Sequence, residues 1–354
     1  MTHPPLRRLA LCALAVVLAT APASGQEVDE PPGYVDGVTN AGTSAAAFLQ
    51  IGVGARVQAM GNAGTVVADD ATALFWNPAA VARMGGTAHV AFDHTDWLAD
   101  TQLDYVAAVL PVSAGSAVGL SVLSFQMVDE SPVRTVGQPE GTGEFYSASD
   151  LALGLTYGVA LTDRFSAGLT GKYVHERLWN ETASSFAVDM GIRYRTKLPG
   201  LNLAASISNF GGDLQLDGRD LLRPYDDDPG NASNDQLNVR LDTDAYSLPL
   251  YFRFGVGYEQ SFGDMHKVVL ATDLLHPSDN SEAVNVGAEY TFWDTLSLRG
   301  GALALFQEDR TGRFSLGAGV QRRVVGGIRL SADYAYAQWG VLNDTHRFTV
   351  SISR

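Results

Sequence analysis

Cysteine is almost absent from this sequence: among 354 residues the single example is Cys12, close to the N-terminus. The rest of the chain therefore offers no thiol for catalysis or metal binding and no disulfide. Long apolar runs are missing too, since no uninterrupted stretch of about eighteen apolar residues follows the first 25 residues. Because a helix needs about 20 such residues to cross a bilayer, we exclude a helical membrane protein.

Basic residues are scarce: 24 Lys and Arg stand against 39 Asp and Glu, for a formal net charge of −15. Nucleic-acid binding requires clustered Lys and Arg, so no nucleic-acid partner is expected. The acidic excess is compatible with acidic surface loops or with a saline habitat. By itself it says little about the fold.

The N-terminus has the pattern of a secretory signal peptide. Arg7 and Arg8 form the basic region, Leu9 to Leu18 the short apolar region, and residues 19–25 a series dominated by small residues. We expect residues 1–25 to be removed near Ala23 or Gly25. Loss of the two arginines would then change the net charge from −15 to −17.

From about residue 86 onward the chain breaks into segments of roughly ten residues with alternating polarity, which is the period of β-strands. In residues 186–195, the even positions are apolar or aromatic, whereas the odd positions carry Gly, Ala, Asp and Arg. The same division recurs in residues 250–259, 284–292 and 329–336. Each such strand has one apolar face and one face rich in glycine and charge.

Alternation alone does not distinguish a soluble β-sandwich from a membrane β-barrel. The aromatic residues Tyr194, Tyr258, Phe292 and Phe348 stand at the ends of apolar rows. This placement is typical of the interfacial girdles of membrane barrels, and glycine with charge on the other face is typical of a polar lumen.

The number and spacing of the segments favour the barrel. Every second link is short, whereas the intervening links are generally longer and include the two longest, 129–149 and 211–246. Outer-membrane barrels have short periplasmic turns, long external loops and an even number of strands. We therefore predict an all-β fold, a transmembrane antiparallel β-barrel of about 14 strands over residues 86–354, with outer-membrane lipid around it. The expected strands are 86–96, 103–112, 117–128, 150–160, 164–177, 184–195, 201–210, 247–260, 266–276, 282–292, 296–307, 313–324, 327–338 and 345–353.

Two segments precede the barrel. Residues 26–47 are polar, small and contain Pro and Gly, which predicts a flexible leader. Residues 48–85 are rich in glycine and alternate poorly, so we expect a compact plug (hatch) with short helices. Asp69 or Asp70 is expected to cap one helix, and Asn77 followed by Pro78 has the order that starts another.

The plug residues carry a family resemblance. The motifs Gly52-x-Gly54-Ala55-Arg56, Met60-Gly61-x-Ala63-Gly64, Ala68-Asp69-Asp70-Ala71-x-Ala73 and Trp76-Asn77-Pro78-Ala79 resemble the N-terminal hatch of the PorV/PorQ family, a branch of the FadL-like outer-membrane barrels. Residues 273–290 and 333–348 contain further stretches that resemble the same family. The resemblance covers about residues 45–354. One departure is the C-terminal Ser351-Ile352-Ser353-Arg354, which lacks the terminal aromatic residue expected for barrel insertion.

The resemblance implies a fourteen-stranded barrel with its N-terminal segment folded into the lumen. PorV-like members serve the type IX secretion system, where they hold or shuttle cargo proteins. Classical FadL-like members pass hydrophobic small molecules. Two hypotheses follow: a secretion accessory that binds cargo or machinery proteins through loops 129–149 and 211–246, and a passive transporter with a hydrophobic ligand in its lumen.

Motifs for other functions are missing or incomplete. Gly52-x-Gly54 is not a dinucleotide loop, because Val57 takes the third glycine position and no βαβ unit follows. His89 and His94 lie five residues apart on one expected strand and so face opposite sides. We find no hydrolase, zinc-protease or phosphate-loop motif. The protein is thus expected not to be an enzyme and to use no cofactor or metal.

Two groups of candidate site residues remain. The first is the plug segment Phe75, Trp76, Asn77, Pro78 and Ala79, which could gate the lumen or simply wedge the plug against the wall. The second is an acidic loop whose oxygen atoms suit calcium, although its spacing is not that of an EF-hand and a solvated loop is the simpler reading. The second group consists of Asp226, Asp227, Asp228, Asn231 and Asp235.

Overall fold

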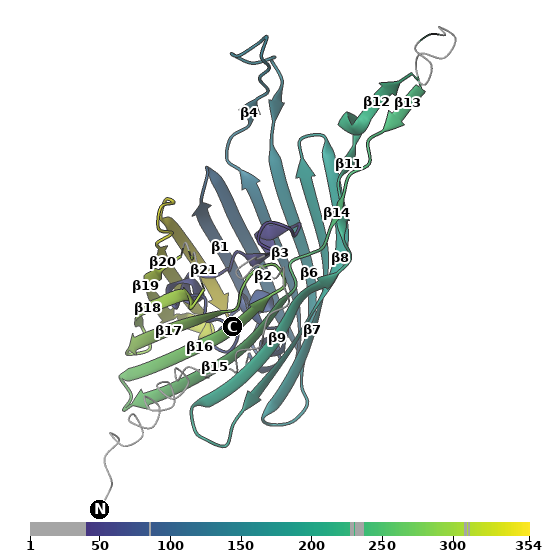
Figure 1. The fold of residues 1–354 in the computed structure, drawn as a ribbon. Coiled ribbons are helices and arrows are strands. Elements are labelled where there is room, and N and C mark those ends of the chain that lie inside the picture. Colours follow the sequence, from purple (N-terminus) through teal and green to yellow (C-terminus); the bar gives the residue numbers. More distant parts are fainter. Residues whose placement is uncertain (1–39, 85, 227–229, 231–236, 308–309, 311) are drawn as a thin grey trace, which may run out of the picture. The chain divides into compact units, whose positions relative to one another are not determined.

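The computed structural model describes residues 40–84, 86–226, 230, 237–307, 310 and 312–354 (Figure 1). The expected signal peptide, residues 1–25, and residues 26–39 of the expected leader lie outside the described residues.

Fourteen antiparallel strands of the described chain form a closed barrel (Figure 1). Each strand pairs with the next barrel strand along the chain, and the last strand pairs with the first over His89↔Ser353 to Asp96↔His346. The predicted barrel of about fourteen strands is therefore confirmed. The barrel strands are β1 (His89–Trp97), β2 (Thr101–Ser113), β3 (Ser116–Met127), β6 (Ala148–Ala160), β7 (Phe165–Leu178), β8 (Glu181–Arg195), β9 (Leu201–Gly211), β15 (Tyr251–Phe262), β16 (His266–Pro277), β17 (Ala283–Phe292), β18 (Leu296–Leu305), β19 (Phe314–Arg323), β20 (Arg329–Ala337) and β21 (Thr345–Ser353).

The apolar side chains of the barrel strands point outward and the polar ones inward, which is the reverse of a soluble protein. On β8, Phe186 is 73% exposed and the apolar row that it begins stays exposed, whereas Asp189 on the opposite face is only 3% exposed. On β15, Phe252 is exposed and Arg253 is buried. Apolar side chains can face outward along a whole barrel only if the surrounding medium is lipid, and the lumen then receives the polar row.

The two ends of the barrel differ. The C-terminus lies at the end where all six links are short, and we call this the short-turn end. The opposite end, the long-link end, includes links 128–147 and 212–250. Two links at this end, 98–100 and 179–180, are as short as the turns at the other end. The alternation in the sequence did not predict the short link 179–180, because β7 and β8 extend beyond the residues in which one strand face is apolar.

The two longest links contain small hairpins of their own, which extend away from the barrel in Figure 1. In the first link, β4 pairs with β5. In the second, β10 pairs with β14, β12 pairs with β13, and β11 adds two residues to the edge of β8. These strands are β4 (Ser131–Pro132), β5 (Phe145–Tyr146), β10 (Leu214–Gln215), β11 (Asp217–Gly218), β12 (Leu222–Tyr225), β13 (Leu237–Arg240) and β14 (Ala245–Tyr246), and the short helix η3 (Arg219–Leu221) precedes β12.

The N-terminal segment fills the lumen with short helices, as predicted for the plug. Its contacts with the wall begin at Ser44, whose hydroxyl donates to Asp279, and at Ala46, whose N–H donates to Glu176. These contacts place the last residues of the expected leader against the barrel. The helices are η1 (Ala47–Gln50), α2 (Ala55–Ala59), α3 (Ala73–Trp76) and η2 (Pro78–Arg83), with η4 (Val325–Gly327) in a turn between β19 and β20.

None of the helices in the described part of the chain is long and apolar enough to cross a membrane.

Candidate functional site

Asn77 lies where the plug meets the barrel wall, and all its polar atoms are engaged. Its Oδ1 accepts from the N–H of Ala79 at 3.0 Å and so caps η2, with Pro78 at the first helical position. Its Nδ2 donates to the carbonyls of Thr65 at 3.2 Å and of Ile192 at 3.1 Å. One buried amide thus joins two parts of the plug to β8, and the expected Asn-Pro helix start is found here.

The other predicted cap is not found. Helix α3 follows Thr72, and no side chain caps it. Asp70 instead accepts from the N–H of Thr72 in the turn before the helix, while Asp69 pairs with Arg56. The expectation that Asp69 or Asp70 caps a helix is therefore wrong, because both carboxylates have other partners.

Phe75 and Trp76 contact a buried cation of the wall. Their rings are 5.2 Å apart in an edge-to-face arrangement. The guanidinium of Arg253 lies 6.0 Å from the Phe75 ring, 5.6 Å from the Trp76 ring and 4.1 Å from the Tyr251 ring. Arg253 also donates to Ser208 at 3.1 Å. Cation–π contact and one hydrogen bond therefore keep this buried charge in place.

Glycines of the wall allow the plug backbone to approach closely. Gly158, Gly168 and Gly191 lie side by side on β6, β7 and β8, and we call them the β6–β8 glycine row. A Cβ atom on Gly168 would lie 2.3 Å from the carbonyl oxygen of Pro78, and one on Gly191 would lie 2.1 Å from Oδ1 of Asn77. Any larger residue here would displace the plug.

A second glycine contact lies on another part of the wall. Gly287 on β17 and Gly301 on β18 are register partners. A Cβ atom on Gly287 would lie 2.2 Å from the carbonyl oxygen of Met60, and one on Gly301 equally close to the N–H of Gly61. That N–H donates to the Ser315 hydroxyl at 3.0 Å. The plug is therefore seated on the wall at two separate places.

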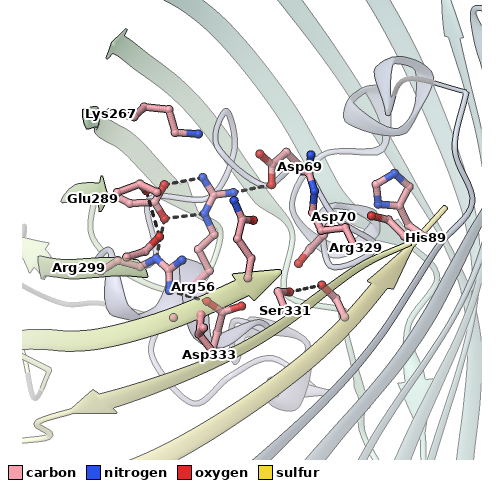
Figure 2. Close-up of a pocket in the computed structure, with 17 residues that line it drawn as sticks. Arg56, Asp69, Asp70, His89, Lys267, Glu289, Arg299, Arg329, Ser331 and Asp333 are labelled. Carbon is pink, nitrogen blue, oxygen red and sulfur yellow. Dashed lines mark hydrogen bonds and ion pairs between the residues drawn. The ribbon is translucent and has the colours of Figure 1, made fainter. Parts of the chain in front are cut away.

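Next to this second contact lies a polar pocket of about 130 Å³ (Figure 2). Glu289 lies between two arginines: Arg56 of the plug donates to both its carboxylate oxygens at 2.8 and 2.9 Å, and Arg299 donates to Oε2 at 2.6 Å. Arg299 also donates to Asp333 at 2.6 Å. Asp69 binds Arg56 from the plug side. The side chains of Glu289 and Arg299 are 3% and 5% exposed, so the wall side of the network is buried, whereas Asp69 at its other end is exposed.

Arg56 is a permanent cation in this network. Burial alone would lower the pKa of its guanidinium, but the charges of Asp69 and Glu289 more than compensate, so that its pKa lies above the ordinary value. A buried, paired charge of this kind fixes the register of the plug on the wall, because displacement of Arg56 would leave Glu289 with Arg299 as its one remaining charged partner in the network.

The lumen wall has two chemically different halves. In the half formed by β2 to β8, the inward residues of β2 and β3 are mainly apolar, among them Leu103, Tyr105 and Leu123. The strands β6 to β8 combine apolar residues such as Val174 with the Lys172–Asp189 ion pair. On β15 to β21 many are charged, among them Arg253, Asp273, Glu289 and Arg299. The apolar half packs against Leu49, Leu74 and Val81 of the plug.

The predicted acidic loop lies largely outside the described residues. Of the acidic loop, only Asp226 belongs to the described residues; Asp227, Asp228, Asn231 and Asp235 lie outside them. On β1, His89 faces the lumen side and His94 the lipid side, as the spacing predicted. Within the described ranges, no group of three or more His, Cys, Asp or Glu side chains is placed to hold a metal ion.

The sequence alone does not identify the charged partners of the plug. Arg56 and Glu289 are 233 residues apart, and Ala55 and Thr349 are 294 apart. Local alternation shows that Glu289, Arg299 and Asp333 face the lumen but cannot show which plug residue meets them. The available signal was the presence of charge at inward positions of neighbouring strands.

A comparison with known families gives a match that covers the plug and half of the barrel strands. A family model described as PorV, type IX secretion system protein PorV, matches residues 36–217, about half of the chain. The matched range includes the plug and β1 to β9, whereas the stretches 273–290 and 333–348 lie outside it. No curated protein matches the sequence.

Solved structures with the same fold are FadL-like barrels. The toluene transporter TbuX of Ralstonia pickettii is 14% identical at a TM-score of 0.56, covering 86% of this chain and 98% of that one. A FadL homologue of Pseudomonas aeruginosa is 13% identical at a TM-score of 0.53, with the same coverage. The CymD monoaromatic hydrocarbon channel is 13% identical at 0.54, covering 85% and 96%. At these identities the likeness concerns the fold alone.

Proposed function

Since the chain belongs to the PorV family of type IX secretion system proteins, we propose that it is an outer-membrane accessory of that system, which binds cargo or machinery proteins at the cell surface. The apolar outer face of the barrel and the signal-peptide pattern support this location. By the general rule for outer-membrane barrels, the short-turn end faces the periplasm and the long-link end faces the exterior.

The filled lumen supports a role that needs no open channel. Plug residues from Val53 to Ala82 are almost entirely buried. They are held on one side by the β6–β8 glycine row and on another by the Arg56–Glu289–Arg299 network. A plug seated at two places closes the lumen, and contact with proteins then falls to the surface at the long-link end.

The long links offer such a surface. The hairpins carry exposed apolar residues outside the expected membrane zone, including Phe145, Leu222, Leu237 and Leu241. The link 212–250 is attached to the barrel, because the N–H of Asp220 donates to the side chain of Glu181, the first residue of β8. Exposed apolar groups on a fixed support are typical of protein interaction sites.

The observation that carries the proposal is the distribution of charge. The links at the long-link end contain 19 acidic and six basic residues, a net charge of −13 out of −15 for the chain. The fourteen strands contain equal numbers of both signs. A field concentrated at one end steers a partner of opposite charge to that end.

The test replaces residues 219–241 of the link 212–250 with a Gly-Ser linker of about six residues. Leu214, Leu216 and Leu248 remain, because they pack on the plug cluster. We expect the variant to fold but to lose the secreted proteins that co-purify with the intact protein. Insertion of the same linker between Asp163 and Arg164, at the short-turn end, is the control. Unchanged co-purification by a folded variant would contradict the proposal.

A second candidate function is passive transport of hydrophobic compounds, favoured by the apolar half of the lumen around Tyr105 and Phe75. It requires that the plug open a path along this wall. Purified protein in liposomes should then accelerate entry of a fatty acid or an aromatic tracer, and Asn77→Ala should increase it further. If neither protein raises the rate above that of empty liposomes, transport is not the function.

A further inference from the structure

The first and last strands meet at a seam that no hairpin connects. β1 and β21 pair along eight residues, yet the partners Asp93 and Thr349 are 256 residues apart in sequence. Bringing such distant strands together carries a larger loss of chain entropy than closing a hairpin. The seam is therefore the place where the barrel most needs additional contacts.

The inner face of this seam carries buried charge. Asp93 on β1 is 0% exposed and Arg347 on β21 is 2% exposed. Their closest charged atoms are 3.6 Å apart, longer than a direct hydrogen bond. Neither strand alone provides full partners for these two groups, and buried charge without partners strongly opposes folding.

The plug supplies part of the missing hydrogen bonding from its backbone, although Asp93 Oδ1 and Arg347 Nε and Nη2 keep no hydrogen-bond partner among the described residues. Arg347 donates to the carbonyl of Gly52. The N–H of Ala55 donates to the hydroxyl of Thr349 at 2.6 Å, and this hydroxyl in turn donates to Asp93 at 2.6 Å. The plug segment Gly52–Ala55 therefore bonds to β21 directly and to β1 through Thr349.

Trp76 holds that segment in place. Its indole N–H donates to the carbonyl of Val53 at 2.9 Å. A Cβ atom on Gly52 would lie 2.7 Å from the ring of Trp76. Gly54 adopts a positive φ of 85° and lies next to the side chain of Thr72. The conformation of Gly52–Ala55 thus depends on the part of the plug that is seated on the β6–β8 glycine row.

We propose that plug docking and closure of the β1–β21 seam form one cooperative step, in which Gly52 and Ala55 provide backbone hydrogen bonds to the polar groups of the closing strands. The plug is then part of the closed barrel, and it cannot leave the lumen as a gate while β1 and β21 remain paired. This inference does not depend on the secretion role, because it concerns only the plug and the wall.

The test uses the lack of thiols outside the N-terminus. Ala91→Cys places a reporter on the buried inner face of β1 opposite Ser351, and Ala152→Cys places one on the buried inner face of β6. Each is combined with Thr349→Val, which removes the bridging hydroxyl. In detergent, we expect thiol labelling at position 91 to become about tenfold faster, the change that corresponds to losing about one buried hydrogen bond, while labelling at position 152 stays unchanged.

Thr156→Val is the matched control, because Thr156 and Thr170 share a buried hydroxyl contact at 2.7 Å between the hairpin-linked strands β6 and β7. It should not affect labelling at position 91. Trp76→Phe, which keeps an aromatic side chain but removes the indole N–H, should act like Thr349→Val, and the two together should have less than their summed effect. Equal labelling at position 91 in Thr349→Val and Thr156→Val, or in Trp76→Phe and the protein with the reporter alone, would overturn the proposal.

Discussion

Asn77 shows how much one side chain decides at the boundary between plug and wall. Its carboxamide provides an acceptor to Ala79 and two donors to carbonyls of Thr65 and Ile192. A carboxylate of the same shape keeps the acceptor for the helix N-terminus but has no donor for the two carbonyls. The substitution Asn77→Asp therefore separates the capping role from the bridging role.

We expect Asn77→Asp to lower the free energy of unfolding by about 3 kcal/mol at neutral pH, because two buried carbonyls lose their donors and face a charge. The introduced carboxyl should have a raised pKa in the folded protein, so the loss should shrink as the pH falls towards about 4, where unfolded Asp protonates. Asn77→Ser, a neutral cap, should lack this pH dependence. Thermal unfolding in detergent at both pH values is the measurement, and a pH-independent loss would contradict the assignment.

At the scale of elements, the glycines of the wall separate into those that meet the plug and those that do not. Gly168 and Gly171 are both on β7, but a Cβ atom on Gly168 would strike Pro78 whereas one on Gly171 would meet nothing within 4 Å. We expect Gly168→Ala to destabilise the protein by about 1–3 kcal/mol through overpacking. Gly171→Ala should be neutral or slightly stabilising. Similar unfolding temperatures for both variants would show that the plug is not tightly seated there.

The elements also show where sequence reasoning succeeds and where it stops. Alternation placed the barrel strands within a few residues, because lipid and lumen impose opposite demands on successive side chains. It did not indicate the hairpins β4–β5 and β12–β13, whose faces are both in water and carry no period-2 pattern. It also ended strands early beside link 179–180, where the alternation fades.

The candidate site was predictable only in its local part. Asn77 with Pro78 could be recognised as a helix start because the signal lies in adjacent residues. The partners Glu289, Arg253 and Thr349 come from strands more than a hundred residues away, and their pairing depends on the closure of the barrel. The glycines of Gly52-x-Gly54 can be recognised in the sequence, but the groups that bond at the β1–β21 seam are the carbonyl of Gly52 and the N–H of Ala55.

At the scale of the whole molecule, charge is sorted by position: the strands are neutral as a set and the long-link end carries −13. If this end binds a basic partner, association should depend on salt. We expect the association rate constant of a co-purified secreted protein to fall roughly tenfold between 50 and 500 mM NaCl, because screening removes the steering field while leaving short-range contacts. Surface-immobilised barrel in detergent allows the rate to be measured directly.

Two sets of neutralised variants locate the source of this dependence. Asp129, Asp213 and Asp244 lie on the long links, whereas Asp163, Asp264 and Asp294 lie on turns at the short-turn end. Changing the first three to Asn should slow association at low salt and weaken its salt dependence, while the second three should have no effect although the change in net charge is identical. Equal effects of both sets would mean that total charge, and not its placement at the outer end, controls the encounter.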